Sequence, residues 1–373
     1  MGAASCVSKQ NTNITGRNKN FIHYFDWIPP NIYLFSPSTK KGQLILQKSG
    51  SAIHLPLGYD TVQMDDRIFL SGGYYFSTSD CKNTFELIPR GLNSELIEKT
   101  DMLFAKRAHT LTGVEGLHVF LSLGGFIENT ESAICEQYDI NTEDWIQAPN
   151  LTEAKTCITA CSFLKTQKLS STTLEDYISA FSVYAFSGRL SGEEVSRTVE
   201  QLQMLTLHKD EEMDPSALVS MDQSVEEAYK GEGERNQQNS KPQESLIREP
   251  TAHTKQASRV VAKTWNRIRV KGAWEGNVSA AAICMGSACK GQILLFGGRE
   301  QGIGGTSSSW IYDVQEGKIC KTAALKGNEY FLLRKPRIVG NKVYAIGYLG
   351  KDVHVYCMHS QEWSIINKHQ WHP

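Results

Sequence analysis

Five residues of this chain share a context that makes their chemistry of interest. Each directly follows a glycine that ends an apolar run, and they are Tyr74, Phe126, Arg189, Arg299 and Tyr348. Arginine can donate two parallel hydrogen bonds to a carboxylate, and aromatic rings offer flat apolar surface for stacking. Side chains of these two kinds at equivalent positions suit recognition of an extended peptide that carries acidic side chains.

Cysteine and histidine could ligate a metal, but their spacing does not favour a metal site. The pairs Cys157 with Cys161 and Cys284 with Cys289 lack the further ligands of a zinc site. They fall in runs of small residues that we expect to be buried inner strands, where thiols are ordinary. The chain also has no glycine-rich phosphate loop before a helix and no nucleophile motif in the required context. We therefore predict no catalytic residue, no metal and no cofactor.

The five glycines also mark a repeat along the chain. They are Gly73, Gly125, Gly188, Gly298 and Gly347, at intervals of 52, 63, 110 and 49 residues, and the long interval contains an insertion. A buried strand that turns sharply needs a residue that tolerates positive φ and close backbone approach, which glycine supplies. A period near 50 residues is typical of repeats that each form one four-stranded propeller blade.

The repeat resembles that of kelch proteins. Two units have the kelch tyrosine and tryptophan seven positions apart, Tyr138 with Trp145 and Tyr356 with Trp363. Such aromatic rings would cover the surface between neighbouring sheets. The other units depart from the pattern: Phe85 stands for the tyrosine, Ile319 replaces the tryptophan partner of Tyr312, and Ser187 and Ile346 replace first glycines.

The resemblance spans about residues 32–366 and implies an all-β fold, a six-bladed kelch-type β-propeller, with five or seven blades as alternatives. The expected units are 21–52, 53–102, 103–152, 153–272, 273–325 and 326–368. Each unit would have strands a to d in order, with the glycines at the end of strand b. The first unit is incomplete, and the segment FIHYFDW is a candidate for its missing strand.

The resemblance also implies a binding surface. In kelch adaptors of ubiquitin ligases, the residue after the glycine pair lines a peptide-binding face, together with basic residues that begin strand a. This role falls to Tyr74, Phe126, Arg189, Arg299 and Tyr348, and to Arg107 and Lys155. In the alternative interpretation, Glu131, Glu193 and Glu194 of the same loops pair with the arginines internally.

Three segments make up the expected domain organisation: a flexible tail at 1–20, the propeller at 21–368, and within it an insertion at 209–257. The insertion has few large apolar residues and an acidic character, so we expect it to be disordered. It separates strand c (VEQLQMLTL) from strand d (TWNRIRV) of one blade. The loop at 165–176, between strands a and b of that blade, would leave from the same face.

Composition narrows the function classes. Lys and Arg total 39 against 40 Asp and Glu, a balance that does not favour nucleic-acid binding. Nine scattered cysteines without a secretory leader indicate reduced thiols and a cytoplasmic protein. No run approaches the length of a membrane-spanning helix. We expect a monomeric adaptor or scaffold that is not an enzyme. A propeller enzyme acting on a small sugar or amide is the alternative.

The N-terminus MGAASC leaves two interpretations open. Gly2 is placed for N-myristoylation, although Cys6 stands where serine or threonine is preferred. Acylation of Gly2 and Cys6 together would supply the two-chain anchor that stable membrane attachment needs, and the protein would then be a lipid-anchored scaffold. Otherwise residues 1–20 form an unmodified tail.

Overall fold

The structure is a computed structural model, built almost entirely of β-strands. It describes residues 22–25, 32–46, 56–64, 67–75, 80–88, 95–168, 177–207, 259–285, 291–300, 304–327, 335–347 and 352–367. The tail at 1–20, with Gly2 and Cys6, and the insertion at 209–257 lie outside these residues. Contacts divide the chain into two units, Met1–Met204 with Ala262–Pro373, and Leu205–Val261. In the described residues, no helix is long and apolar enough to cross a membrane.

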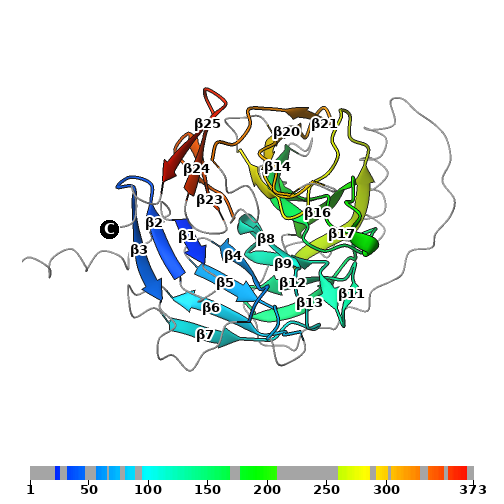
Figure 1. Cartoon of the computed structure of the whole chain (residues 1–373). Helices are drawn as coiled ribbons and strands as arrows, with labels where there is room; N and C mark the ends of the chain where they lie inside the picture. Colours follow the sequence, from blue (N-terminus) through cyan, green and yellow to red (C-terminus); the bar gives the residue numbers. More distant parts are fainter. Residues whose placement is uncertain are drawn as a thin grey trace, which may run out of the picture. The chain divides into compact units, whose positions relative to one another are not determined.

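Five antiparallel sheets of four strands each stand in a ring as the blades of a β-propeller (Figure 1). Blade I has strands β4 (Asp60–Met64), β5 (Arg67–Ser71), β6 (Thr84–Ile88) and β7 (Glu95–Lys99). Blade II has strands β8 (Thr110–Val114), β9 (Val119–Leu123), β12 (Cys135–Asp139) and β13 (Asp144–Ala148). A two-stranded ribbon, β10 (Phe126–Ile127) and β11 (Thr130–Glu131), lies between β9 and β12 in the chain.

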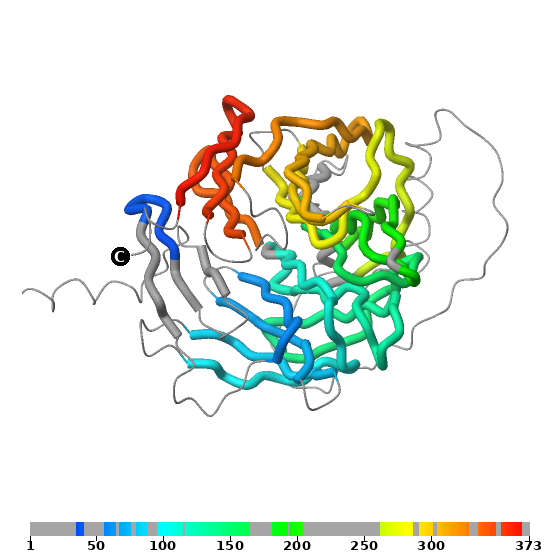
Figure 2. The backbone as a smooth tube through the Cα atoms, in the orientation of Figure 1, coloured from blue at the N-terminus to red at the C-terminus, as the bar shows by residue number. Residues whose placement is uncertain are grey.

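The remaining blades follow in chain order around the ring, as the colours of Figure 2 show. Blade III has strands β14 (Thr159–Lys168), β15 (Tyr177–Phe186), β16 (Val199–Leu207) and β17 (Arg259–Ile268). Blade IV has strands β18 (Ala281–Cys284), β19 (Gln292–Phe296), β20 (Ser309–Asp313) and β21 (Lys318–Lys321). Blade V has strands β22 (Arg337–Val339), β23 (Lys342–Ile346), β24 (Asp352–Cys357) and β25 (Glu362–Asn367).

The all-β propeller and the strand order a to d are confirmed, but the sixth blade is not. The opening unit forms a three-stranded sheet of β1 (Ile22–Phe25), β2 (Ile32–Ser36) and β3 (Lys41–Leu46). Phe35 of β2 packs against Tyr344 of blade V, with ring centroids 6.5 Å apart, and joins a cluster with Ile346 and Val353. The sheet thus contacts blade V, yet it has no glycine pair and no fourth strand among the described residues.

Blade III differs from its neighbours in strand length. Strands β14 and β15 pair along ten residues, from Thr159 opposite Phe186 to Lys168 opposite Tyr177. The segment at 165–176, expected as a loop, therefore begins with four strand residues. Residues 209–257 do separate β16 from β17, strands c and d of this blade, as the sequence predicts.

The glycine pair ends strand b in a left-handed turn. The first position has φ near +60°, with +66° at Gly72 and +54° at Ser187, a value that L-residues can adopt. The second position is more demanding: φ is +101° at Gly73, and a Cβ there would lie 2.6 Å from the carbonyl oxygen of Leu57. Serine can therefore replace the first glycine, whereas the second position of blades I to IV requires glycine.

Strand pairing corrects two positions of the repeat. Tyr138 lies opposite Phe120 and Trp145, and the register of blade I places Leu87, not Phe85, at the equivalent position. In blade V the amide of Gly347 donates to Asp352 O, at 3.2 Å, as Gly72 and Gly297 do to their strand-c neighbours. Gly347 thus holds the first glycine position, not the second, and Ile346 is the last residue of strand b.

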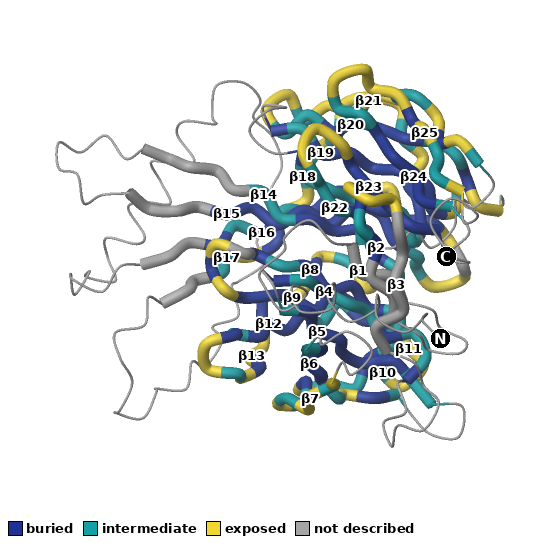
Figure 3. The backbone as a smooth tube through the Cα atoms, turned by 90° about the vertical axis from the view of Figure 1, so that its left-hand side faces the viewer, coloured by how far each residue is buried: buried dark blue, intermediate teal, exposed yellow. Residues whose placement is uncertain are grey.

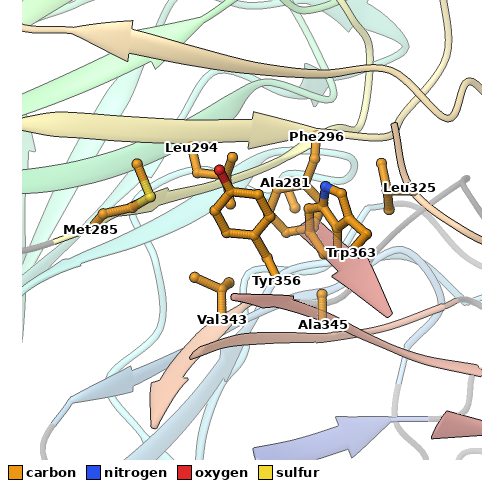
Figure 4. Packing of buried hydrophobic residues seen from close by; sticks show 9 residues of the cluster. All are labelled: Ala281, Met285, Leu294, Phe296, Leu325, Val343, Ala345, Tyr356 and Trp363. Atoms are coloured by element: carbon orange, nitrogen blue, oxygen red, sulfur yellow. The ribbon is translucent and has the colours of Figure 1, made fainter. Parts of the chain in front are cut away.

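Aromatic side chains fill the space between blades. The middle strands β9 and β12 are buried along most of their length, whereas the outer strands β13 and β25 have only two and one buried residues (Figure 3). Between blades IV and V, Trp363 packs against Phe296 and Tyr356, at centroid distances of 4.9 and 5.1 Å (Figure 4). The expected role of the tyrosine and tryptophan pair is confirmed here.

Three of the buried tryptophans also donate a hydrogen bond to the preceding blade. Trp145 Nε1 donates to Thr84 Oγ1 and Thr100 O, both at 3.1 Å, and Trp363 Nε1 donates to Ser309 Oγ at 3.1 Å. In blade III, Trp265 Nε1 donates to Pro149 O at 3.0 Å. Trp265 thus does for blade III what Trp145 does for blade II. Its role is hidden in the sequence, because the insertion separates it from the rest of its repeat.

Candidate functional site

Backbone pairing fixes the residue that follows each glycine pair. In blades I to IV this residue exchanges two hydrogen bonds with a residue just before strand a. The pairs are Tyr74 with Leu57, Phe126 with Arg107, Arg189 with Thr156, and Arg299 with Val278, at 2.7–3.2 Å. These side chains are thus held at the same end of successive blades, as the sequence pattern predicts.

Four of the predicted residues form one continuous stack, which we call the rim ladder: Tyr74, Arg107, Phe126 and Arg189. The guanidinium carbon of Arg107 lies 5.9 Å from the ring centroid of Tyr74 and 4.8 Å from that of Phe126. The guanidinium carbon of Arg189 also lies over the ring of Phe126, 5.2 Å from its centroid. Cation and ring alternate across blades I, II and III, within the range of cation–π attraction.

The charge of Arg107 is compensated within the protein. Its Nη1 pairs with the carboxylate of Asp80, and its Nη2 donates to Asn129 Oδ1 at 2.8 Å. The side chain of Asp80 is only 8% exposed, so this pair is partly shielded from water. Arg107 is therefore held between its two aromatic neighbours, and both of its terminal nitrogens already donate a hydrogen bond.

Arg189 is placed differently. Its Nε is buried and has no hydrogen-bond partner, and no carboxylate pairs with its guanidinium among the residues that the structure describes. The side chain is half-buried against Phe126. Three internal partners were considered for the arginines: Glu131 and Glu194 make no ion pair with Arg189, and the side chain of Glu193 lies outside the described part of the structure. Within the described part of the chain, Arg189 thus lies beside an aromatic ring and has no carboxylate partner.

Arg299 and Tyr348 complete the predicted set only in part. Arg299 is exposed at the equivalent position of blade IV, and its backbone pairs with Val278 and Gly305. The rim ladder as defined above does not include Arg299. Tyr348 lies outside the described residues.

Lys155 is not on the exposed surface. Its side chain is 0% exposed and its Nζ lies 2.6 Å from Glu200 Oε1 and 3.0 Å from Thr198 Oγ1. The repeat explains the difference: the partner of Phe126 is Arg107, and the equivalent partner of Arg189 is Thr156. Lys155 instead matches Lys106, which is 0% exposed and lies 2.7 Å from Glu136 Oε2. The predicted peptide-binding role does not fit a lysine buried in this way.

The partners of Arg107 were missed in the sequence. Asp80 and Asn129 both lie in connections between strands b and c, the same connections in which the glutamates were considered. Asn129 has φ of +65°, a conformation that asparagine adopts more readily than most residues. Composition of those loops identifies such candidates, but only the fold decides which side chain reaches the arginine.

His109 is a buried polar residue close to the rim ladder. It is 4% exposed, neither ring nitrogen has a hydrogen-bond partner among the described residues, and its ring lies against Gly72. Blade III has Ile158 at the equivalent position, with its side chain against Gly124. Burial lowers the pKa of His109 to about 3, while the charge of Asp60 opposes this shift. His109 is therefore neutral in the folded protein.

We expect stability to fall as the pH drops below about 6.5, because the unfolded chain then protonates His109 whereas the folded chain resists until about pH 3. The contribution is about 1.4 kcal/mol per pH unit. His109→Ile should remove it, with no loss of stability at neutral pH. Denaturant unfolding between about pH 7 and pH 4.5 measures both slopes. His118→Asn, at an exposed histidine, is the control, and an unchanged slope in His109→Ile would contradict this assignment.

Fold and site together define a β-propeller whose rim carries alternating arginines and aromatic rings. No known family model matches the sequence, and no curated protein with which it was compared matches it either.

Proposed function

We propose that this protein is a non-catalytic interaction module of the kelch type, an adaptor or scaffold that acts as a monomer. Its ligand is an extended peptide segment of a partner protein, with an acidic side chain that reaches Arg189. The kelch assignment is supported by the glycine pairs at strand ends and by the tryptophans that bridge successive blades. The rim ladder supports the peptide ligand.

The observation that carries the proposal is the contrast between the two arginines. Arg107 is neutralised by Asp80 and already hydrogen-bonded, so it contributes chiefly a flat surface between two rings. Arg189 has no carboxylate partner among the described residues. A ligand carboxylate at Arg189 would gain charge-assisted hydrogen bonds, and the adjoining Phe126 ring would pack against apolar parts of the same peptide.

The rim is suited to one well-placed acidic residue more than to a run of them. Asp80 lies beside Arg107 and would repel a second carboxylate there. Arg299, exposed on blade IV, is the other arginine at an equivalent position that a longer peptide could reach. We therefore expect binding motifs with one essential acidic position next to apolar or aromatic residues.

Selection of random peptides on the purified full-length chain tests this. The enriched peptides should share one acidic position, and Arg189→Gln should weaken their binding about ten- to a hundredfold, since a hydrogen bond to a charged group contributes about 1.5–3 kcal/mol. Titration calorimetry or fluorescence anisotropy measures the dissociation constants. The double variant Arg189→Glu with Arg299→Glu should abolish binding.

Arg197→Glu is the matched control, because Arg197 is 61% exposed on the same blade as Arg189 and pairs with the exposed Glu275. It should bind like the unaltered protein. Peptides without a shared acidic position, or equal losses in Arg197→Glu and Arg189→Glu, would refute the proposed mode of binding.

A further inference from the structure

The inner strands carry one equivalent position in each blade, next to the ring's axis. It is the residue paired with the last residue of strand b: Asp60 with Ser71, Thr110 with Leu123, Thr159 with Phe186 and Ala281 with Phe296. In blade V, Arg337 pairs with Tyr344, and continuing that antiparallel register places Lys335 at the same position, opposite Ile346.

Three of these residues bind the next blade directly. Asp60 Oδ2 accepts from the amide of Leu111 at 2.7 Å, which joins blade I to blade II. Thr110 Oγ1 donates to Ile158 O at 2.6 Å, and Thr159 Oγ1 donates to Ala280 O at 3.1 Å. The same position thus makes a chain of hydrogen bonds from blade I through blade IV.

Lys335 of blade V extends this chain of hydrogen bonds, but it contacts blades that do not directly follow its own in the ring. Its Nζ lies 2.9 Å from Asp60 Oδ2 and donates to Leu111 O at 2.8 Å. It thus reaches blades I and II, although the three-stranded sheet β1 to β3 stands between blades V and I (Figure 1). In the described residues that sheet has no fourth strand.

We propose that Lys335, Asp60 and the backbone of Leu111 form an ionic clasp that closes the ring between its last and first blades. The joints between blades II and III and between III and IV use neutral hydroxyl groups, whereas the clasp uses two charges. The side chains of Lys335 and Asp60 are 39% and 24% exposed, so salt screens their attraction. The seam between blades V and I is therefore the part of the inner ring whose closure depends on ionic strength.

Hydrogen exchange on the full-length chain, read by mass spectrometry, tests the clasp. Lys335→Met should accelerate exchange of peptides from β8 and β22 about three- to tenfold at low salt, while peptides from β14 and β18 keep their rates. In the unaltered protein, raising the salt from about 0.05 M to about 1 M should accelerate the same seam peptides. Lys335→Met should no longer respond to salt.

Lys82→Met is the matched control, since it removes another exposed lysine that lies 3.6 Å from a carboxylate, Asp101, away from the axis. It should exchange at the seam like the unaltered protein and respond to salt in the same way. Should Lys335→Met not fold, the salt response of the unaltered protein decides alone. Equal salt responses at the seam and at the joint of blades III and IV would refute the clasp.

Discussion

Lys155→Met should lower the free energy of unfolding by about 3–5 kcal/mol, one of the two largest effects that we expect. The side chains of Lys155 and Glu200 are both 0% exposed and lie 2.6 Å apart. Removing the lysine leaves a buried carboxylate without its counter-charge, and the only other donor it keeps in the described structure is the amide of Thr152, at 2.7 Å. Chemical denaturation at neutral pH measures the loss.

A second variant separates the loss of the charge pair from the loss of packing. Lys155→Met combined with Glu200→Leu removes both charges, and replacing a whole buried pair by apolar residues is often nearly neutral. We expect the double variant to recover most of the stability, but not all, because the amide of Thr152 and Thr198 Oγ1 lose partners. A single variant as stable as the unaltered protein would show that the pair is not buried in solution.

The same arrangement recurs one blade earlier. Lys106 Nζ lies 2.7 Å from Glu136 Oε2 and donates to Ile134 O at 2.9 Å, while Glu136 Oε1 accepts from the amides of Leu103 and Phe104. Glu136 and Glu200 thus each connect strand c of their own blade to the segment that precedes strand a of that blade. Because the amides and the lysine point at one carboxylate, the pair positions the segment that leads to the rim.

Trp363→Ala is the second large effect, an expected loss of about 3–5 kcal/mol. Trp363 is 2% exposed, packs between Phe296 and Tyr356, and donates to Ser309 Oγ. Truncation leaves a cavity between blades IV and V and removes the hydrogen bond that joins them. Thermal and denaturant unfolding of the purified variant measure the change.

Graded variants identify the source of this loss. Trp363→Phe keeps an aromatic ring and loses the indole N–H, so it should cost less than the alanine variant. Ile146→Ala removes an apolar side chain that is 54% exposed on an outer strand and should change stability by less than about 0.5 kcal/mol. If Trp363→Ala were as mild as Ile146→Ala, the aromatic contact between blades IV and V would not stabilise the fold.

The sequence by itself determined the features that depend on local backbone chemistry. In blades I to IV the second glycine position has a φ between +84° and +124°, which strongly favours glycine, so the ends of these strands leave a visible mark in the chain. Those marks were enough to predict blades, the strand order, the position of the insertion and the tyrosine and tryptophan pairs of blades II and V. Four of the predicted rim residues also come together, because the glycine pair fixes the residue that follows it.

The tertiary structure decided what depends on contacts between blades. Burial of Lys155, compensation of Arg107 by Asp80, and the role of Trp265 each involve residues far apart in the chain. Strand pairing also moved Gly347 by one position of the repeat, and moved the position equivalent to the tyrosine by two, from Phe85 to Leu87. The clasp of Lys335 with Asp60 exists only because a ring brings the two ends of a propeller together, and no spacing within one repeat encodes that contact.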